Sequence, residues 1–413
     1  MTISSHISDL LKELKNEKQP RTHKAFEQLL THVPKSAESL LFLATNEPQK
    51  GYWEQLCEEI DDKIEEAQHP VVLVALEALL ERWDDSIRVL PTEWIDWLLE
   101  PDNEPLARII RTVHLNDPNE REMLSLCQTP NARYLTHLKI GYSNFDKQFW
   151  EECQKYSYLT NLKHLAFWGS NNPTMMAFIH SQQMQHLQKL ELLSCTLQDE
   201  QLIQIMESPY LSKITSLDLG KLSDLNPNHI TSKGLEFLAR SSIALQELDL
   251  QENIDLQCHT QSKCMSLLAH HRGFNSLSTL GLAGCLKDTS PQQIRTWFRH
   301  AINFKHLKKL DLSKNHLQDE HFKQLILSDS LIKLEWLRLT NNHLTHLSLE
   351  QFVRKNKLSH LEYLEIYAQI HPQQKNILTF PAKSLQNIKK RYPSLSINTG
   401  FHALPIIETS FCS

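Results

Sequence analysis

From about residue 131 onward, the apolar residues follow a recurring template, Leu-x-x-Leu-x-Leu. Two copies read almost alike: LQKLELLSCTLQDEQLIQIM from Leu187 and LKKLDLSKNHLQDEHFKQLI from Leu307. The alternating Leu-x-Leu segment predicts a strand with one buried face, and the apolar positions after it have helical spacing. Each copy therefore predicts one strand followed by one helix.

The template recurs often enough to predict a stacked array. Clear copies begin at Leu135, Leu162, Leu187, Ile214, Leu245, Leu277, Leu307, Leu334 and Leu361. A weaker tenth copy lies in YPSLSINTG, where Leu395 and Ile397 take the two inward strand positions. The copies start about 25 to 32 residues apart, which is a period of repeat proteins. Because one strand cannot bury its apolar face alone, the units must stack and pair their strands in parallel.

This pattern resembles leucine-rich repeats of the longer, ribonuclease-inhibitor-like subtype, over residues from about 131 to 400. The resemblance implies an α/β solenoid, in which a leucine-rich repeat arc has a parallel concave sheet and outer helices. A small polar residue is expected after each strand, where backbone groups need a partner. Asparagine takes this position in three units and other residues take it elsewhere: Asn253, Asn315 and Asn342, then Cys195, Cys285, Ser143, Ser170, Leu222 and Gln369. The cysteines at these positions are interpreted as structural.

Residues 1–130 have a different pattern, with apolar positions at helical spacing in KAFEQLLTHV and PVVLVALEALLERW. Pro70 suits a first helical turn, and short helices are also expected around 92–100, 104–114 and 119–127. This part carries about 13 Lys and Arg against about 25 Asp and Glu. We therefore predict an acidic, all-α N-terminal domain over 1–130 that covers the exposed end of the sheet, a repeat array of nine or ten units over 131–400, and a C-terminal tail over 401–413.

The whole chain has 413 residues, a formal charge of -6 and eight cysteines without a Cys-x-x-Cys pair. This cysteine usage predicts a reduced, cytoplasmic setting. The N-terminus lacks the pattern of a signal peptide, and no apolar run approaches the roughly 18 residues of a membrane span. Compositions rich in Lys, Asn, Gln and His are common in low-GC bacteria, some of which export repeat proteins, so an effector in a host cytosol is the alternative localisation.

Outward residues of the predicted strands form the candidate binding face, with an acidic centre between aromatic ends. The predicted partner-binding residues are Tyr142, Trp168, Glu191, Asp218, Glu247, Asp249, Asp311, Trp336, Arg338, Tyr363 and Tyr367. Trp, Tyr and Arg dominate binding hot spots, so we predict a protein-protein interaction scaffold with an unidentified protein partner on the concave face. No Lys/Arg-dense stripe appears, and so nucleic acid is not expected as a partner. A small-molecule substrate and a cofactor are not expected either.

Catalytic and metal-binding constellations do not assemble in the sequence. It has 9 glycines and no Gly-rich phosphate loop. The pairs His137 with His164 and His316 with His343 would be neighbours on adjacent units, but a metal would need a third ligand. Bacterial leucine-rich repeat ubiquitin ligases are excluded because no Cys-x-Asp occurs. The likeness to Ran GTPase-activating proteins is one of fold class only, and fold does not fix function. We therefore predict that the protein is not an enzyme.

An adaptor function is the alternative to a simple scaffold. The stretch VLPTEWIDWLLEPDNEPLARI from Val89 resembles the opening of an F-box, a helical motif that docks on a ubiquitin-ligase adaptor. An N-cap Thr92 followed by an amphipathic helix explains the same string without an adaptor. Docking would need residues 89–110 as an exposed helical surface.

Overall fold

The computed structural model describes residues 5–15, 19–20, 23–170, 173–222, 224–253, 261–370, 377–378 and 380–399. The predicted tail, 401–413, lies outside this range. The chain forms two compact units. Unit 1 comprises Met1–Leu165 and Ala177–Leu187, and unit 2 comprises Ala166–Met176 and Gln188–Ser413.

The α-helices in chain order are α1 Ser5–Leu14, α2 Lys24–Leu30, α3 Glu38–Ala44, α4 Lys50–Asp62, α5 Ile64–Ala67, α6 Pro70–Leu80, α7 Ile95–Leu99, α8 Glu104–Ala107, α9 Glu120–Gln128, α10 Lys147–Lys155, α11 Met176–Ile179, α12 Asp199–Glu207, α13 Ser232–Arg240, α14 Gln261–His270, α15 Pro291–Arg299, α16 Asp319–Ile326, α17 His346–Lys355 and α18 Ala382–Arg391. The strands are β1 Thr112–Asn116, β2 His137–Gly141, β3 His164–Trp168, β4 Lys189–Leu193, β5 Ser216–Asp218, β6 Glu247–Asp249, β7 Thr279–Gly281, β8 Lys309–Asp311, β9 Trp336–Arg338, β10 Tyr363–Glu365, β11 Gln369–Ile370, β12 Ile377–Leu378 and β13 Ser396–Asn398.

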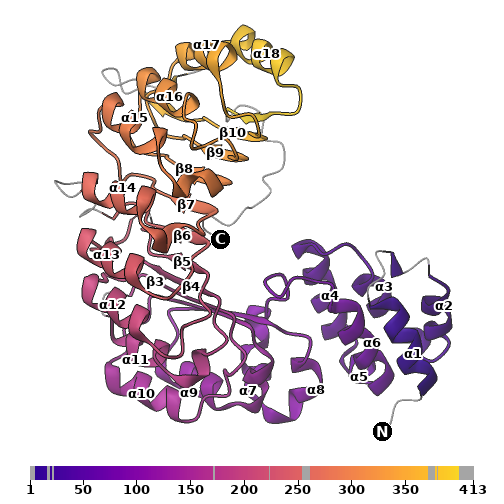
Figure 1. The fold of residues 1–413 in the computed structure, drawn as a ribbon. Coiled ribbons are helices and arrows are strands. Elements are labelled where there is room, and N and C mark those ends of the chain that lie inside the picture. The colour runs from indigo at the N-terminus through magenta and orange to yellow at the C-terminus, as the bar shows by residue number, and fades with distance from the viewer. Residues whose placement is uncertain are drawn as a thin grey trace. The chain divides into compact units, whose positions relative to one another are not determined.

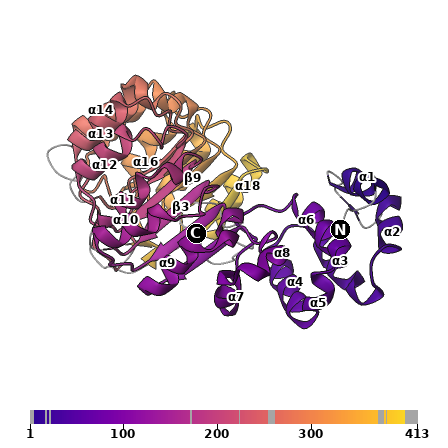
Figure 2. The same cartoon turned by 90° about the horizontal axis from the view of Figure 1, so that it is seen from below.

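Each predicted copy of the template forms a strand, including the weak tenth copy at β13. Strands β1 to β10, followed by β13, form one sheet of eleven strands in chain order. In unit 2 the register aligns equivalent leucines, for example Leu217 with Leu248 and Leu248 with Leu280, and these side chains are buried. The strands of this unit lie on one side and helices α12 to α17 on the other (Figure 1). The view at right angles again has α12 to α14 as the outer layer (Figure 2).

Helix α6 is central to the helices that open unit 1. It begins at Pro70, whose missing N–H costs nothing in a first turn, and it is apolar on nearly every face. Leu76, Leu79 and Leu80 are buried, and α1 and α3 pack against this helix. Most of the described residues up to Ala107 are therefore helical.

The sheet, however, begins earlier than predicted. The helix expected over 104–114 ends at Ala107, and β1 pairs in parallel with β2 from Thr112. The helical prediction for the second half of that stretch is therefore wrong. In TVHLN, Val113 and Leu115 point inward and His114 points out, and this alternation with period two is that of a strand.

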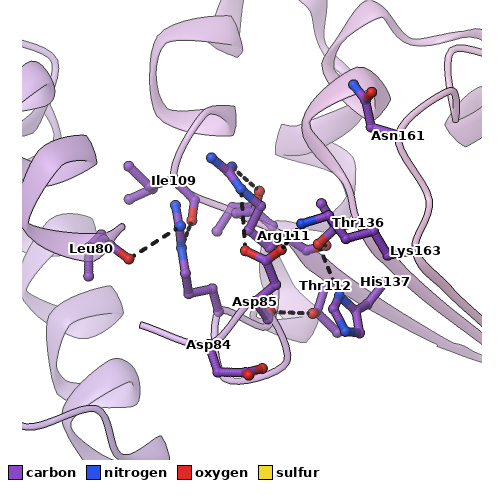
Figure 3. Close-up of polar contacts among 12 residues, drawn as sticks. Leu80, Asp84, Asp85, Ile109, Arg111, Thr112, Thr136, His137, Asn161 and Lys163 are labelled. Carbon is purple, nitrogen blue, oxygen red and sulfur yellow. Dashed lines mark hydrogen bonds and ion pairs between the residues drawn. The ribbon is translucent and has the colours of Figure 1, made fainter. Parts of the chain in front are cut away.

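Residues 88–90 cover the outer edge of β1. The Thr112 N–H donates to the Arg88 carbonyl at 3.1 Å, and the Leu90 N–H donates to the Thr112 carbonyl at 2.8 Å. Asp85 supports this segment because its carboxylate lies 3.2 Å from Lys163 Nζ and 3.7 Å from Arg111 Nε (Figure 3). Backbone groups at the free edge of β1 are thus hydrogen-bonded by an extended segment, and not by a helix.

A ladder of polar side chains supports the turns after the strands. The Asn342 amide donates to the Leu312 and Leu339 carbonyls at 3.0 Å each, and its oxygen accepts from the Asn315 and Leu317 N–H groups. Asn315, Asn253 and Gln369 also donate to carbonyls of the preceding unit. The predicted role of this position is therefore confirmed where Asn and Gln occupy it.

One member of the ladder was predicted wrongly. In the unit of β5 the position is taken by Asn228 and not by Leu222, because the loop after this strand is longer. The Asn228 amide donates to the Leu192 and Leu219 carbonyls at 2.7 and 2.9 Å. Its oxygen accepts from the Cys195 and Leu197 N–H groups.

Cysteines replace asparagine in two units, and the structure places both in the core. The Cys285 thiol donates to the Leu250 carbonyl at 2.9 Å, and the Cys195 thiol lies 3.5 Å from the Phe167 carbonyl. Burial raises the pKa of Cys195 to about 12 and raises the pKa of Cys285 as well. Because the thiolate is the reactive form of cysteine and both pKa values are raised, neither thiol is activated as a nucleophile.

We expect iodoacetamide at pH 8 to leave Cys195 and Cys285 unmodified in the folded protein and to alkylate both in denaturant. Mass spectrometry of the tryptic peptides measures this directly. Rapid labelling of either residue in the folded chain would contradict the core position.

The duplicated Leu-Gln-Asp-Glu sequence has a structural explanation. Asp199 opens α12, and its carboxylate accepts from the N–H and the hydroxyl of Thr231, the N-cap of α13, at 2.9 and 2.6 Å. Asp319 accepts from Thr345, the N-cap of α17, at 2.8 and 2.6 Å. Each Asp therefore joins the start of its own helix to the start of the next, which sets the stacking of the outer layer.

Candidate binding face

The strand face of unit 2 consists of the side chains that point away from the helices, in two parallel rows. The first row is Lys189, Ser216, Glu247, Thr279, Lys309, Trp336 and Tyr363. The second row is Glu191, Asp218, Asp249, Gly281, Asp311, Arg338 and Glu365. Neighbours within a row are register partners on adjacent strands, so their side chains stand next to one another.

The carboxylates of the second row are far less exposed than charged strand residues usually are. Glu191, Asp218, Asp249, Asp311 and Glu365 are between 3% and 8% exposed. Side chains of the same face crowd them, since they stand between the first row and the turns that follow the strands. The acidic centre predicted from the sequence is therefore present, but its charges are recessed.

Each aspartate of the second row also holds its own turn. The Oδ1 atoms of Asp218, Asp249 and Asp311 accept, at 2.8 Å each, the backbone N–H two residues further on. This local hydrogen bond is typical of aspartate at the end of a strand. It fixes one carboxylate oxygen and leaves the other to face the row.

Glycine leaves room for Asp249. A Cβ atom on Gly281 would lie 2.4 Å from Cγ of Asp249, so this carboxylate occupies the space over the glycine. A Cβ atom on Gly220 would lie 3.0 Å from Oδ1 of Asp218 and 3.7 Å from Oδ1 of Asp249. The two carboxylates therefore stand close together, on adjacent strands and with the same charge.

This arrangement changes the acidity of the row. Burial, together with the charges of Asp249 and Glu191, raises the pKa of Asp218 well above its ordinary value. Burial raises the pKa of Asp249 to about 7, and the charge of Asp311 adds to this shift. Burial also raises the pKa of Asp311 itself. Removing a carboxylate from water disfavours its charged form, and a second negative charge nearby adds to the effect.

The aromatic and basic residues of β9 and β10 form one cluster. The Trp336 and Tyr363 rings are parallel within 4°, with centroids 6.2 Å apart. The Arg338 guanidinium lies 5.3 Å from the centroid of Trp336, donates to Glu365 at 2.8 Å and lies 3.5 Å from Asp311. The structure thus brings together five of the residues that face outward in the predicted strands.

The other predicted residues lie apart from this cluster. Glu247 of β6 is half-buried and accepts from the Ser216 hydroxyl at 2.8 Å, while Tyr367 follows β10 and is half-buried. Trp168 ends β3, and Tyr142 lies in unit 1, in the turn after β2, where it is exposed. The sequence prediction missed Lys189, whose Nζ lies 2.6 Å from Glu191. Its position two residues before Glu191 on β4 was readable from the same template.

Histidine pairs form where the spacing predicts them. The rings of His137 and His164 have centroids 5.2 Å apart, as do those of His316 and His343. Burial lowers the pKa of His137 to about 4, so this ring is neutral at pH 7. Among the residues that the structure describes, no group of three or more His, Cys, Asp or Glu side chains could hold a metal ion.

The stretch that resembles an F-box is packed against its own unit. Leu90, Trp94, Leu98 and Leu106 are buried, and the described residues of the stretch form two short α-helices, α7 and α8, each preceded by a 3-10 turn. An adaptor would need these apolar side chains on the surface. In the described part of the chain, no helix is long and apolar enough to cross a membrane.

No protein-family model and no curated protein sequence matches this chain. Solved structures with a similar fold include a Bacteroides fragilis protein, with 14% identity over 70% of this chain and 73% of that one, at a TM-score of 0.37. An internalin, inlF, from Listeria monocytogenes has 17% identity over 73% of this chain and 83% of its own, at a TM-score of 0.37. A third structure, TLR13 in complex with ssRNA13, has 16% identity over 73% of this chain and 42% of TLR13, at a TM-score of 0.38.

These similarities concern the fold only. The fold class follows from features of this chain itself. From β4 to β10, equivalent leucines are in register and each strand pairs in parallel with the next, and the polar ladder recurs after the strands. The chain has the leucine-rich repeat fold. The repeats also correct one expectation from the sequence. TLR13, which is similar to this chain in fold, was solved in complex with ssRNA13, and the expectation that nucleic acid is not a partner is withdrawn. That exclusion rested on linear motifs, whereas a repeat face gathers its residues from many units.

Proposed function

We propose that this leucine-rich repeat protein is a binding scaffold, and not an enzyme, that recognises a protein partner on the strand face of unit 2. One observation carries the proposal: the Trp336, Arg338 and Tyr363 cluster stands beside a row of recessed carboxylates on the same face. Aromatic and arginine side chains next to charged groups are the composition of binding hot spots.

The charge of the face favours one kind of partner. Acidic residues outnumber basic ones in the two rows, so the face attracts a segment with exposed Lys and Arg side chains. The Trp336 and Tyr363 rings supply an apolar contact next to these charges. We therefore propose a basic protein segment as the partner, and selective capture of RNA by this face would contradict the choice.

Replacing Trp336 and Tyr363 together by alanine is expected to weaken partner binding by about 2 kcal/mol or more, roughly 30-fold. The measurement is the dissociation constant for the partner captured from lysate by the full chain. The matched control replaces Tyr210 and Phe237, two exposed aromatic residues outside the two rows, and should bind like the wild type. Circular dichroism verifies that both variants are folded. Unchanged affinity in the folded Trp336→Ala, Tyr363→Ala variant would refute the proposal.

A further inference from the structure

We infer that one edge of unit 2 binds the surface of a membrane that contains anionic lipids. This basic edge consists of the last turns of helices α15 to α18 and the segments that lead from them into strands β8, β9, β10 and β13, over residues 297–308, 324–335, 353–362 and 389–395. Its residues precede the two rows of the strand face in the chain. The inference therefore goes beyond the proposed function.

The four segments of the basic edge lie side by side. Strands β8, β9, β10 and β13 pair in parallel in this order, and helices α15 to α18 pack against one another in the same order (Figure 1). The Glu335 N–H donates to the Lys308 carbonyl at 2.9 Å, and the Glu362 N–H donates to the Glu335 carbonyl at 2.8 Å. These helices therefore end, and these strands begin, at one edge of the unit.

Positive charge is concentrated on this edge. It has ten lysine and arginine residues and three acidic ones, although the whole chain has a formal charge of -6. All ten basic side chains are exposed: Arg299, Lys305, Lys308, Lys333, Arg354, Lys355, Lys357, Lys389, Lys390 and Arg391. The equivalent segments before β5, β6 and β7, residues 205–215, 238–246 and 268–278, have three basic residues and one acidic residue. The excess charge is therefore a property of the last four segments and not of the repeat.

The acidic residues of the edge do not neutralise this charge. Asp329 lies 2.7 Å from Lys357 Nζ, and Glu335 lies 3.0 Å from Lys308 Nζ. Among the residues that the structure describes, none of the other eight basic side chains has a carboxylate within 4 Å. These eight charges are therefore available to an anionic ligand outside the chain.

Helix termini do not account for the whole edge. Lysine and arginine are favoured in the last turn of a helix, where the carbonyl groups are negative, but Lys305 and Lys333 lie beyond the last turns. Two isoleucines on consecutive segments are also exposed. Ile302 is 62% exposed, the highest fraction for a large apolar side chain in the described part of the chain, and Ile332 is 41% exposed. The edge thus presents apolar side chains among its positive charges.

The exposed apolar side chains are aliphatic, and this favours a membrane over a nucleic acid. The aromatic rings of the edge are buried or half-buried: Trp297, Phe298, Phe304 and Tyr392. Proteins that bind single-stranded nucleic acid stack the bases on exposed aromatic rings. Proteins that bind a membrane surface place lysine and arginine near the lipid phosphates and apolar side chains at the boundary of the acyl chains. Ile302 and Ile332 suit the second kind of surface.

Flotation of the full chain with lipid vesicles tests the inference. One kind of vesicle is pure phosphatidylcholine, and the other contains about 30% phosphatidylserine. We expect at least about tenfold tighter binding to the anionic vesicles, because negative headgroups attract each lysine and arginine near the surface. Sodium chloride at about 0.5 M should remove most of this preference, since it screens the charges.

Two variants separate the charge from the apolar contact. The first replaces one lysine of each segment: Lys305→Gln, Lys333→Gln, Lys355→Gln and Lys390→Gln. It should bind anionic vesicles at least about tenfold more weakly. Its matched control makes the same change in charge at exposed sites elsewhere and should bind like the wild type: Lys24→Gln, Lys35→Gln, Lys147→Gln and Lys233→Gln. The second variant, Ile302→Ser, Ile332→Ser, should weaken binding at least about fivefold.

Circular dichroism verifies that the variants are folded. Equal binding to the two kinds of vesicle, or unchanged binding by the lysine variant, would overturn the inference. Tighter binding to polyuridylate RNA than to anionic vesicles, lost in the lysine variant and kept in the isoleucine variant, would assign the edge to nucleic acid instead. These outcomes leave the proposed function standing, because it depends on Trp336 and Tyr363 of the strand face.

Discussion

Replacing Asn342 by alanine is expected to lower the free energy of unfolding by about 3–5 kcal/mol, the largest loss that we predict for a single polar residue here. Asn342 is fully buried, and its side chain serves two carbonyl groups and two N–H groups at the turns of adjacent units. Alanine would leave these backbone groups buried without partners, and each such group costs about 1–3 kcal/mol. Urea unfolding followed by circular dichroism measures the loss.

The control is Asn275→Ala, which removes an exposed asparagine of the same unit of the chain and should change stability by less than about 0.5 kcal/mol. Asn228→Ala should resemble Asn342→Ala, because Asn228 makes the same set of hydrogen bonds. A loss near zero for Asn342→Ala would mean that the ladder does not hold the turns together.

The double variant Asp218→Asn, Asp249→Asn is expected to be more stable than the wild type at pH 8, by on the order of 2 kcal/mol or more. The pKa of Asp249 is raised to about 7 in the folded chain, whereas an unfolded aspartate has a pKa of about 4. Between these values the folded state holds the proton more tightly, so wild-type stability falls as the pH rises from about 4 to about 7. The groups that face Asp249 are Asp218, Asp311, Glu191 and, as the cation, Arg338.

Asparagine removes this dependence because it carries no charge at any pH, while it still accepts the backbone N–H groups. Thermal unfolding at pH 5 and pH 8 measures the effect, with Glu207→Gln, Glu350→Gln as the control. We expect the two proteins to differ little at pH 5 and the Asn variant to melt higher at pH 8. If the melting temperature of the wild type changed between pH 5 and pH 8 in the same way as that of the Asn variant, the result would contradict the recessed position of the carboxylates.

The repeat template located the strands because it encodes burial directly: every second residue of Leu-x-Leu must enter the core. The template did not locate β1, because the apolar positions of that strand are Ile110, Val113 and Leu115 and do not read as Leu-x-x-Leu-x-Leu. The template also did not identify Asn228, because it places the ladder residue at a fixed distance after the strand and the loop after β5 is longer. Which residue joins the ladder depends on which backbone groups of the folded turn need hydrogen-bond partners.

The residues that make up the strand face could be predicted from the sequence, but the burial of their side chains could not. The template places Asp218, Asp249 and Asp311 outward, and the structure has them outward. Their burial arises from neighbours on other units and from the lean of Asp249 over Gly281, which no single repeat reveals. The bridge made by Arg338 likewise needs three adjacent strands.

Hydroxyl-radical footprinting of the full chain, alone and with its captured partner, tests the central claim most directly. Tyr363 and Tyr367 are half-buried on β10 and just after it, whereas Tyr210 and Phe237 are exposed outside the two rows. If the strand face of unit 2 binds the partner, oxidation of Tyr363 and Tyr367 falls in the complex while that of Tyr210 and Phe237 is unchanged. Protection of Tyr210 and Phe237 with no change at Tyr363 and Tyr367 would contradict the account.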